Sequence, residues 1–484
     1  MVAGCFAKFC FCKGTTFPLI ALPMFAALFW IIQRTRGLTK TFSVGLCFGI
    51  GYFASTLYWV AESFKCVGLG NYGYIAVSLL VLYLALYPAT ACVLTKMFAT
   101  TRLNFLLFFT SFWILTEYLR GVVFTGFPWN LIGYATYDLE YFPQIADTLG
   151  IYGVSFIFLL IVSLLTYCRT AICGLLLYIF TTLYGYYKVN CYDGYVKPDD
   201  QNFVTIVQPS ITQESKMDVK QLKNNIDKHI QLSCISNIYS KKQLIIWPEG
   251  AVNIPITSPN NVLNYISSTL KYDDCFIISG CDRIDEMRRL YNCVCAIGRD
   301  NRIAKIYDKR HLLPFGEFIP EILLKCGLRK VTPGIVNFSS GHSKKTFQLD
   351  GFQKFDVAIC YEISFPGEVL DDQGSSWILN VTNDSWFKNS DGPTQHLRTA
   401  CFRAIEEGKA IVRCANNGIS CVIDCNGQIL KKLETNEVGR MATTMPKKWQ
   451  LTIFSVHKNK IVILVVCTLL ILLLCVRNRR AKIK

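Results

Sequence analysis

Charge is scarce in this chain of 484 residues. Only 17% of the side chains are charged and 52% are hydrophobic, whereas soluble proteins carry about a quarter charged residues. This scarcity argues against an ordinary cytosolic protein. The mean hydropathy of +0.32 also excludes an intrinsically disordered chain, which needs low hydrophobicity and high charge.

Nucleotide and metal signatures are absent from residues 191–459. The segment contains neither G-x-G-x-x-G nor a phosphate loop, so we expect no nucleotide cofactor. It has no C-x-x-C motif, and Cys293/Cys295 and Cys421/Cys425 lack a nearby His to complete a zinc set, so no metal is expected. Eleven Cys fall in residues 234–425; because the number is odd, at least one thiol cannot pair within this segment.

Long uncharged runs fill residues 1–190, which hold 11 Lys and Arg and 5 Asp and Glu. These runs predict six membrane spans, near residues 17–32, 41–61, 72–95, 104–124, 150–168 and 171–187. Residues 191–459 have mixed charge and predict an extramembrane domain. A last span is expected at 461–476, where the flanking Lys460 and Arg477 extend a stretch that is short for a hydrocarbon layer of about 30 Å. Residues 460–484 then form this span and a basic tail.

The distribution of Lys and Arg predicts the orientation, because short cytoplasmic loops carry an excess of both. The tail 477–484 is basic, which places residues 191–459 outside. Counting spans backwards leaves residues 1–13, with Lys8 and Lys13, outside as well. We therefore expect either a truncated eighth span or an assigned start too far downstream. The net charge of +16 is attributed to topology and anionic lipid rather than to nucleic acid, since no long basic run is interleaved with aromatics.

Three apolar strands in residues 200–445 end in reactive side chains. Glu249 follows a strand that Pro248 terminates, Lys309 lies in the polar stretch 307–317, and Cys360 ends the strand 356–360. Strands that alternate with helical segments, here 214–234 and 394–408, predict a layered α/β domain. The other expected strands are 203–207, 244–247, 275–280, 292–297, 377–381, 411–414 and 421–423. In open α/β folds, sites gather at the carboxyl ends of strands.

A Cys, a Glu and a Lys form a coherent set for acyl transfer through a thioester. The carboxylate can take the thiol proton, and the ammonium can favour the thiolate and stabilise an oxyanion. Each residue alone has a simpler interpretation. Glu249 could be an exposed turn carboxylate, Lys309 part of a solvated basic face, Cys360 a core residue, and His311 structural.

The surroundings of these residues resemble one family, the apolipoprotein N-acyltransferases, which are membrane-bound members of the nitrilase (carbon–nitrogen hydrolase) superfamily. The similar stretches are WPEG at 247–250, YDKRHLLPFGEFIP at 307–320, ICYE at 359–362, NVTNDSWF at 380–387, GPTQHLRTACFRAIEEGKAIVRCANNGIS at 392–420 and, in the membrane part, TEYLRGVVFTGFPWNLIGY at 116–134.

The resemblance implies an αββα sandwich attached to seven or eight transmembrane helices. It implies a triad in which Glu249 is the base, Cys360 the nucleophile and Lys309 the oxyanion donor. The sn-1 acyl chain of a phospholipid, expected to be phosphatidylethanolamine, would pass through a thioester to the N-terminal amine of a diacylglyceryl-cysteine apolipoprotein. This is the last step of bacterial lipoprotein maturation, and it implies a bacterial inner-membrane protein with a periplasmic catalytic domain and no cofactor.

Further positions follow from the same resemblance. Glu317, Tyr361, Glu362 and Asn292 fall on positions that surround the triad; the residues themselves suggest a pocket wall for Tyr361 and a supporting carboxylate for Glu362. Met217 stands where the family has a Trp, which puts a stacking role there in doubt.

The membrane part contributes candidates for lipid access. Phe127 and Trp129 are expected at the outer interface, where they could line the access path or serve only as anchors. Glu117 and Arg120 could pair with each other or meet a headgroup. Two alternative functions stay open: a membrane-tethered amidase of the nitrilase type, and a scaffold without catalytic activity.

Overall fold

Contacts divide the chain into two compact units. The computed structural model describes residues 1–11, 18–191, 199–233, 242–256, 261–269, 275–298, 302–319, 325, 337–445 and 451–483. A helical unit comprises Met1–Ala61, Asn71–Asp193 and Thr452–Lys484, and an α/β unit comprises Glu62–Gly70 and Gly194–Leu451. The short segment Glu62–Gly70 belongs to the α/β unit by its contacts, although the sequence pattern assigned it to the membrane part.

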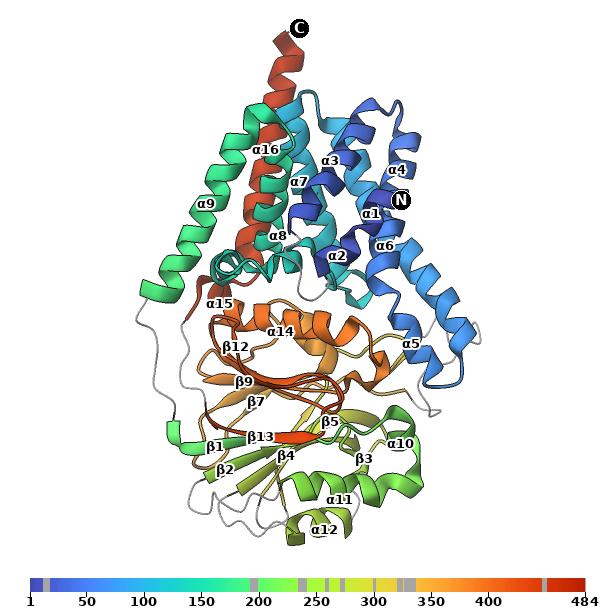
Figure 1. Cartoon of the computed structure of the whole chain (residues 1–484), viewed down its shortest axis with the longest axis vertical. Coiled ribbons are helices and arrows are strands. Elements are labelled where there is room, and N and C mark those ends of the chain that lie inside the picture. The colour runs from blue at the N-terminus through green and yellow to red at the C-terminus, as the bar shows by residue number, and fades with distance from the viewer. Residues whose placement is uncertain are drawn as a thin grey trace. The chain divides into compact units, whose positions relative to one another are not determined.

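The helical unit contains a helix at each expected span (Figure 1). Its helices are α1 (Val2–Cys5), α2 (Ala7–Phe11), α3 (Pro18–Arg34), α4 (Leu38–Leu57), α6 (Gly70–Phe98), α7 (Arg102–Val122), α8 (Ala146–Leu165), α9 (Cys168–Cys191), α15 (Ile453–His457) and α16 (Lys460–Ile483), with α5 (Val60–Lys65) at the boundary. Three 3-10 turns follow α7: η1 (Val123–Thr125), η2 (Ile132–Thr136) and η3 (Phe142–Ile145).

Five helices of the described residues are long and apolar enough to cross a membrane: Gly70–Phe98, Arg102–Thr125, Phe142–Leu165, Cys168–Asn190 and Lys460–Arg479. The helix Leu19–Arg34 is apolar but shorter. Five of the seven expected spans therefore coincide with a helix of sufficient length and hydropathy. Of the N-terminal lysines that the sequence placed outside, Lys13 lies beyond the described residues.

Small residues bring α4 and α6 together. A side chain at Gly45 would approach Ala89, and one at Gly49 would lie 2.8 Å from the Ala85 Cα. Glycine therefore permits a close contact between the two helix backbones, as is common where helices associate in membranes.

The α/β unit has two six-stranded sheets and one additional strand. The first sheet has the order β13-β1-β2-β4-β5-β6, with β3 paired to β4, and the second has the order β12-β11-β10-β9-β8-β7. The strands are β1 (Asp199–Gln208), β2 (Lys242–Ile246), β3 (Val252–Pro255), β4 (Cys275–Ile284), β5 (Leu290–Ile297), β6 (Ile303–Asp308), β7 (Thr346–Phe347), β8 (Phe355–Ile359), β9 (Trp377–Thr382), β10 (Ala410–Ala415), β11 (Ser420–Ile423), β12 (Ile429–Leu433) and β13 (Gly439–Met445). All eight expected strands are present.

Alternation along β2 shows how the layers form. Leu244 and Ile246 belong to the core between the sheets, whereas Ile245 and Trp247 belong to a second core that includes Ile230 of α11. Successive side chains of a strand point to opposite faces, so the first sheet is covered on both faces.

The helices of the unit are α10 (Gln213–Met217), α11 (Leu222–Ser233), α12 (Asn261–Thr269) and α14 (Gly392–Glu407), with 3-10 turns η4 (Val219–Gln221), η5 (Cys360–Ser364) and η6 (Asp384–Phe387). Figure 1 shows α14 on the outer side of the second sheet. The expected αββα sandwich is confirmed.

The helix expected at 214–234 is interrupted. Asp218 has a non-helical backbone (φ −85°, ψ 110°), and its side chain accepts a hydrogen bond from the Lys220 N–H. Asp favours such caps over helix interiors because its carboxylate competes for backbone N–H groups. The segment therefore forms α10, η4 and α11 instead of one helix.

Candidate active site

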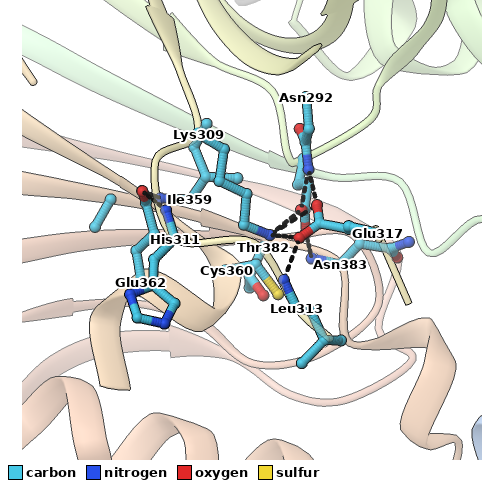
Figure 2. A network of polar contacts seen from close by, with 12 residues as sticks. Asn292, Lys309, His311, Leu313, Glu317, Ile359, Cys360, Glu362, Thr382 and Asn383 are labelled. Carbon is cyan, nitrogen blue, oxygen red and sulfur yellow. Dashed lines mark hydrogen bonds and ion pairs between the residues drawn. The ribbon is translucent and has the colours of Figure 1, made fainter. Parts of the chain in front are cut away.

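The carboxyl ends of several strands deliver the polar side chains of one site. Glu249 follows β2, Lys309 follows β6, Cys360 follows β8, and Asn383 follows β9. Since β8 and β9 run parallel, their carboxyl ends meet at one edge of the sheet. Glu249 forms an ion pair with Lys309, and the charges of both act on the Cys360 thiol. Figure 2 shows Lys309 and Cys360 in the same network of polar side chains.

Glu249 is buried and held by both carboxylate oxygens. Its Oε1 accepts a hydrogen bond of 2.8 Å from the Asn292 side chain and lies 3.4 Å from Lys309 Nζ. Its Oε2 accepts a hydrogen bond of 2.9 Å from the Asn383 backbone N–H. The Lys216 ammonium, which the sequence did not single out, donates to the Glu249 carbonyl oxygen at 2.8 Å. Glu249 is therefore not an exposed turn carboxylate.

Lys309 lies between two carboxylates. Its Nζ is 2.9 Å from Glu317 Oε2, and Glu317 also accepts hydrogen bonds of 2.8 Å from Asn292 and from the Leu313 backbone N–H. Burial lowers the pKa of Lys309, but the charges of Glu317 and Glu249 outweigh it and raise the pKa above its ordinary value. Lys309 therefore carries its positive charge throughout the neutral pH range.

Cys360 occupies a strained backbone position directly after β8. Its φ is +49°, a left-handed conformation that costs side chains other than Gly about 1 kcal/mol or more. The residue is partly exposed. Burial of the thiol and the charge of Glu249 raise its pKa, whereas Lys309 and a hydrogen bond with Thr382 lower it less. The resting form is thus a thiol, and a nucleophilic role would require a base.

Glu362 ties the nucleophile turn to the segment after β6. Its Oε2 accepts a hydrogen bond of 2.8 Å from the Ile359 N–H, and its Oε1 accepts bonds of 2.6 Å from Tyr307 and 2.8 Å from the Arg310 N–H. Burial would raise the pKa of Glu362, but Lys345 and these donors together lower it. Glu362 therefore bonds Ile359 and Arg310, the chain neighbours of Cys360 and Lys309; its supporting role stays a prediction.

Aromatic rings pack beside the nucleophile. Tyr361 is buried, and its ring lies 5.0 Å from that of Phe365. His311 stacks on Phe365 with ring centroids 3.5 Å apart. Tyr361 and His311 therefore both pack on Phe365; the role of Tyr361 as a pocket wall stays a prediction. Met217, at the end of α10, is partly buried and follows Lys216, whose ammonium contacts the Glu249 carbonyl.

The candidates for lipid access lie in the helical unit, where Glu117 and Arg120 are buried in α7. Glu117 accepts a hydrogen bond of 2.9 Å from the Ile132 N–H. Arg120 donates to the carbonyl oxygens of Phe127 and Trp129 at 2.8 and 2.7 Å. Both side chains therefore brace the segment that carries Phe127 and Trp129; their role in lipid access stays a prediction.

Sequence reasoning missed three contributors, namely Lys216, Thr382 and Asn383. The last two lie inside NVTNDSWF, directly after an apolar strand, so their position could have indicated a site. Lys216 gave no such indication. Among the described ranges, no group of three His, Cys, Asp or Glu side chains is arranged to hold a metal ion.

Comparison with known families covers both units. Residues 3–164 match the model of the apolipoprotein N-acyltransferase N-terminal domain, and residues 203–452 match that of the carbon-nitrogen hydrolases.

Individual relatives match over most of their length. The chain is 33% identical to the apolipoprotein N-acyltransferase of Allorhizobium ampelinum over 87% of this chain and 86% of the relative. It is 32% identical to that of Rickettsia typhi over 94% of both chains. Among solved structures, yeast Nit3 of the nitrilase superfamily aligns with 55% of this chain and 96% of its own, at 17% identity and a TM-score of 0.40.

Proposed function

The chain belongs to the apolipoprotein N-acyltransferase family, and from this membership we propose the route by which it acylates lipoproteins. It is a membrane-bound acyltransferase whose acceptor is the N-terminus of a lipoprotein. We propose that Glu249, Lys309 and Cys360 are its catalytic residues, that a phospholipid is the acyl donor, and that a thioester at Cys360 links the two halves of the reaction.

In the first half, Cys360 Sγ attacks the carbonyl carbon of the sn-1 ester while Glu249 takes the thiol proton. The raised pKa of the thiol makes this base necessary. The ammonium of Lys309, fixed by Glu317 and Glu249, stabilises the oxyanion of the tetrahedral intermediate. The ester C–O bond then breaks, and the leaving alkoxide takes the proton from Glu249 and departs as lyso-phospholipid.

In the second half, the N-terminal amine of the apolipoprotein attacks the thioester carbonyl. Glu249 accepts the proton that the amine loses, the C–S bond breaks, and the thiolate of Cys360 takes that proton back. The amide forms without a cofactor or an external reductant. The enzyme is returned to its resting thiol form.

Both substrates carry acyl chains that lie in the bilayer, which supports a catalytic domain held at a membrane. We infer a multi-pass location in a bacterial inner membrane with the α/β unit on the periplasmic side, as the basic tail after α16 suggests. Phosphatidylethanolamine is the proposed donor. The amidase and scaffold alternatives are set aside because the relatives, matched over most of their length, are acyltransferases.

The network around Cys360 carries this proposal, and intact mass tests it. The purified protein is incubated with phosphatidylethanolamine, digested and mapped. We expect an acyl-chain increment on the peptide that contains Cys360, and release of the increment by hydroxylamine.

Cys360→Ala should abolish the adduct. Cys425→Ala is the matched control, because Cys425 is also a partly exposed thiol of the α/β unit, and it should keep full acylation. An increment on another peptide, or none in folded wild-type protein, would rule out the thioester at Cys360.

A further inference from the structure

A buried polar cluster contacts the backbone of Cys360 and has no part in the steps above. It consists of Thr382 at the end of β9, Asp384 in η6, His396 on α14 and Arg413 on β10. His396 and Asp384 are 1% exposed, and Arg413 is fully buried. Burying such groups is costly unless each is bonded. The cluster lies in the stretches NVTNDSWF and GPTQHLRTACFRAIEEGKAIVRCANNGIS, which the triad leaves unexplained.

Asp384 is the centre of this cluster. Its Oδ2 accepts a hydrogen bond of 2.8 Å from Arg413 Nη2, and its Oδ1 accepts one of 3.0 Å from the Thr382 hydroxyl. Burial raises the pKa of Asp384, but the charge of Arg413 and hydrogen bonds such as that from Thr382 outweigh it and lower the pKa to about 2. Asp384 is therefore a carboxylate that can only accept hydrogen bonds.

The imidazole of His396 connects this cluster to the nucleophile. Its Nε2 lies 3.2 Å from the Cys360 carbonyl oxygen. Its Nδ1 lies 3.0 Å from Asp384 Oδ1 and 3.2 Å from Arg413 Nη2. Burial and the charge of Arg413 lower the pKa of His396, so the ring is neutral at neutral pH and carries a single proton.

The neighbours decide which nitrogen carries that proton. The Cys360 carbonyl and the Asp384 carboxylate can each only accept, so the single proton serves one of them. Asp384 Oδ1 already accepts from the Thr382 hydroxyl, and Arg413 Nη2 faces Nδ1 as a donor, which favours the proton on Nε2. Nδ1, left without a proton, can accept from Arg413 Nη2, whose other hydrogen is directed to Asp384 Oδ2. In this tautomer the carbonyl, the ring, the guanidinium and the carboxylate are all hydrogen-bonded. The positive charge of the guanidinium offsets the repulsion between Nδ1 and Asp384 Oδ1, which are 3.0 Å apart.

The contact with the carbonyl matters because the backbone of Cys360 is strained. A planar trans peptide fixes the direction of the Tyr361 N–H once the direction of the Cys360 carbonyl is fixed. The φ of +49° at Cys360 persists only if surrounding bonds hold it. The bond from His396 acts directly on the peptide that follows this strained residue.

We propose that His396 is a positioning residue for the nucleophile. Its Nε2–H holds the Cys360 carbonyl so that the strained turn presents Sγ in one orientation, and Arg413, which donates to Nδ1, keeps the proton on Nε2. The inference rests on the proposed role of Cys360, since it concerns the geometry of the same thiol.

Two amide variants of the full-length protein separate the two ring nitrogens. The amide of His396→Gln can reach the position of Nε2, whereas that of His396→Asn reaches only the position of Nδ1. We expect His396→Asn to lower the rate of acyl-enzyme formation about 100-fold, as misplaced reacting groups do, with KM for the phospholipid and the thermal midpoint unchanged. His396→Gln should recover the rate to within a few-fold of wild type.

Equal losses in both variants, or losses that follow the thermal midpoint, would overturn the proposal. Wild-type protein in the same assay must form the adduct at Cys360; if it does not, the proposed function fails instead. A measurement on wild-type protein is independent of how the variants fold. With ¹⁵N-histidine and ¹³C-carbonyl cysteine, solid-state NMR identifies the ring nitrogen coupled to a cysteine carbonyl, and we expect that nitrogen to be protonated. An unprotonated one would refute the assignment.

Discussion

Among single residues, the thiol of Cys360 has an environment that differs from the sequence-based hypothesis. A nearby lysine suggested a thiolate, but Lys309 is engaged by Glu317 and Glu249, and the remaining effects raise the thiol pKa. The negative charge of Glu249 is part of the cause. Reactivity at Cys360 therefore depends on proton transfer during attack rather than on a preformed thiolate.

Alkylation of Cys360 should accordingly be slow at pH 7. Because the raised pKa moves thiolate formation to higher pH, the rate of modification by iodoacetamide should climb from pH 7 to pH 9 without a plateau. Peptide mapping after timed quenching measures it. Lys309→Met removes the charge that lowers this pKa and should slow labelling further; a plateau below pH 7 would contradict the assignment.

At the scale of secondary-structure elements, close contacts between backbone segments position the site. The chemistry of the site's side chains does not predict these contacts. β4 passes so close to the turn after β2 that a side chain at Gly280 would lie 2.5 Å from the Glu249 Cα and 2.6 Å from the Pro248 carbonyl oxygen. A methyl group has no room there. The position of Glu249, the proposed base, therefore depends on a glycine in the neighbouring strand.

Gly280→Ala should push the turn after β2 away from β4. We expect a loss of roughly 1–3 kcal/mol in stability from overpacking and about a 100-fold fall in acylation from displacement of Glu249. Gly439→Ala in β13 is the matched control, since its nearest neighbour would be 3.4 Å away. Thermal unfolding and single-turnover acylation of both variants measure the effect, and similar behaviour of the two would argue against the close contact.

The elements that sequence could predict are those with continuous apolar runs. The interior strands β2, β8 and β9 are buried at nearly every position, so their uninterrupted apolar runs predicted them. The edge strands β6 and β12 were missed because they are half exposed and contain lysines. Motifs at strand ends singled out the three residues of the proposed triad, which interact in the structure. The bond from Asn383 to Glu249 joins residues 134 positions apart, so it appears only once both sheets are formed.

For the whole molecule, the orientation in the membrane follows from charge and stays a prediction. Lys220 is exposed on η4 in the α/β unit, and Arg479 is exposed near the end of α16. In spheroplasts, a membrane-impermeant maleimide should label Lys220→Cys. Arg479→Cys should be labelled only after permeabilisation. The reverse pattern would place the α/β unit in the cytoplasm.

The arrangement of Glu249, Lys309 and Glu317 has a consequence for which molecules the site attracts. Two carboxylates and one ammonium leave a formal charge of −1 among these three side chains, and salt screens its attraction for an ion that approaches through solvent. Such a site attracts cationic ligands more strongly than anionic ones. The amine of the acceptor arrives mostly as an ammonium, so the same field that attracts it also makes its proton harder to remove. The rate of transfer to the apolipoprotein should therefore fall as ionic strength rises. Hydrolysis of the phospholipid, measured without the apolipoprotein, should change little.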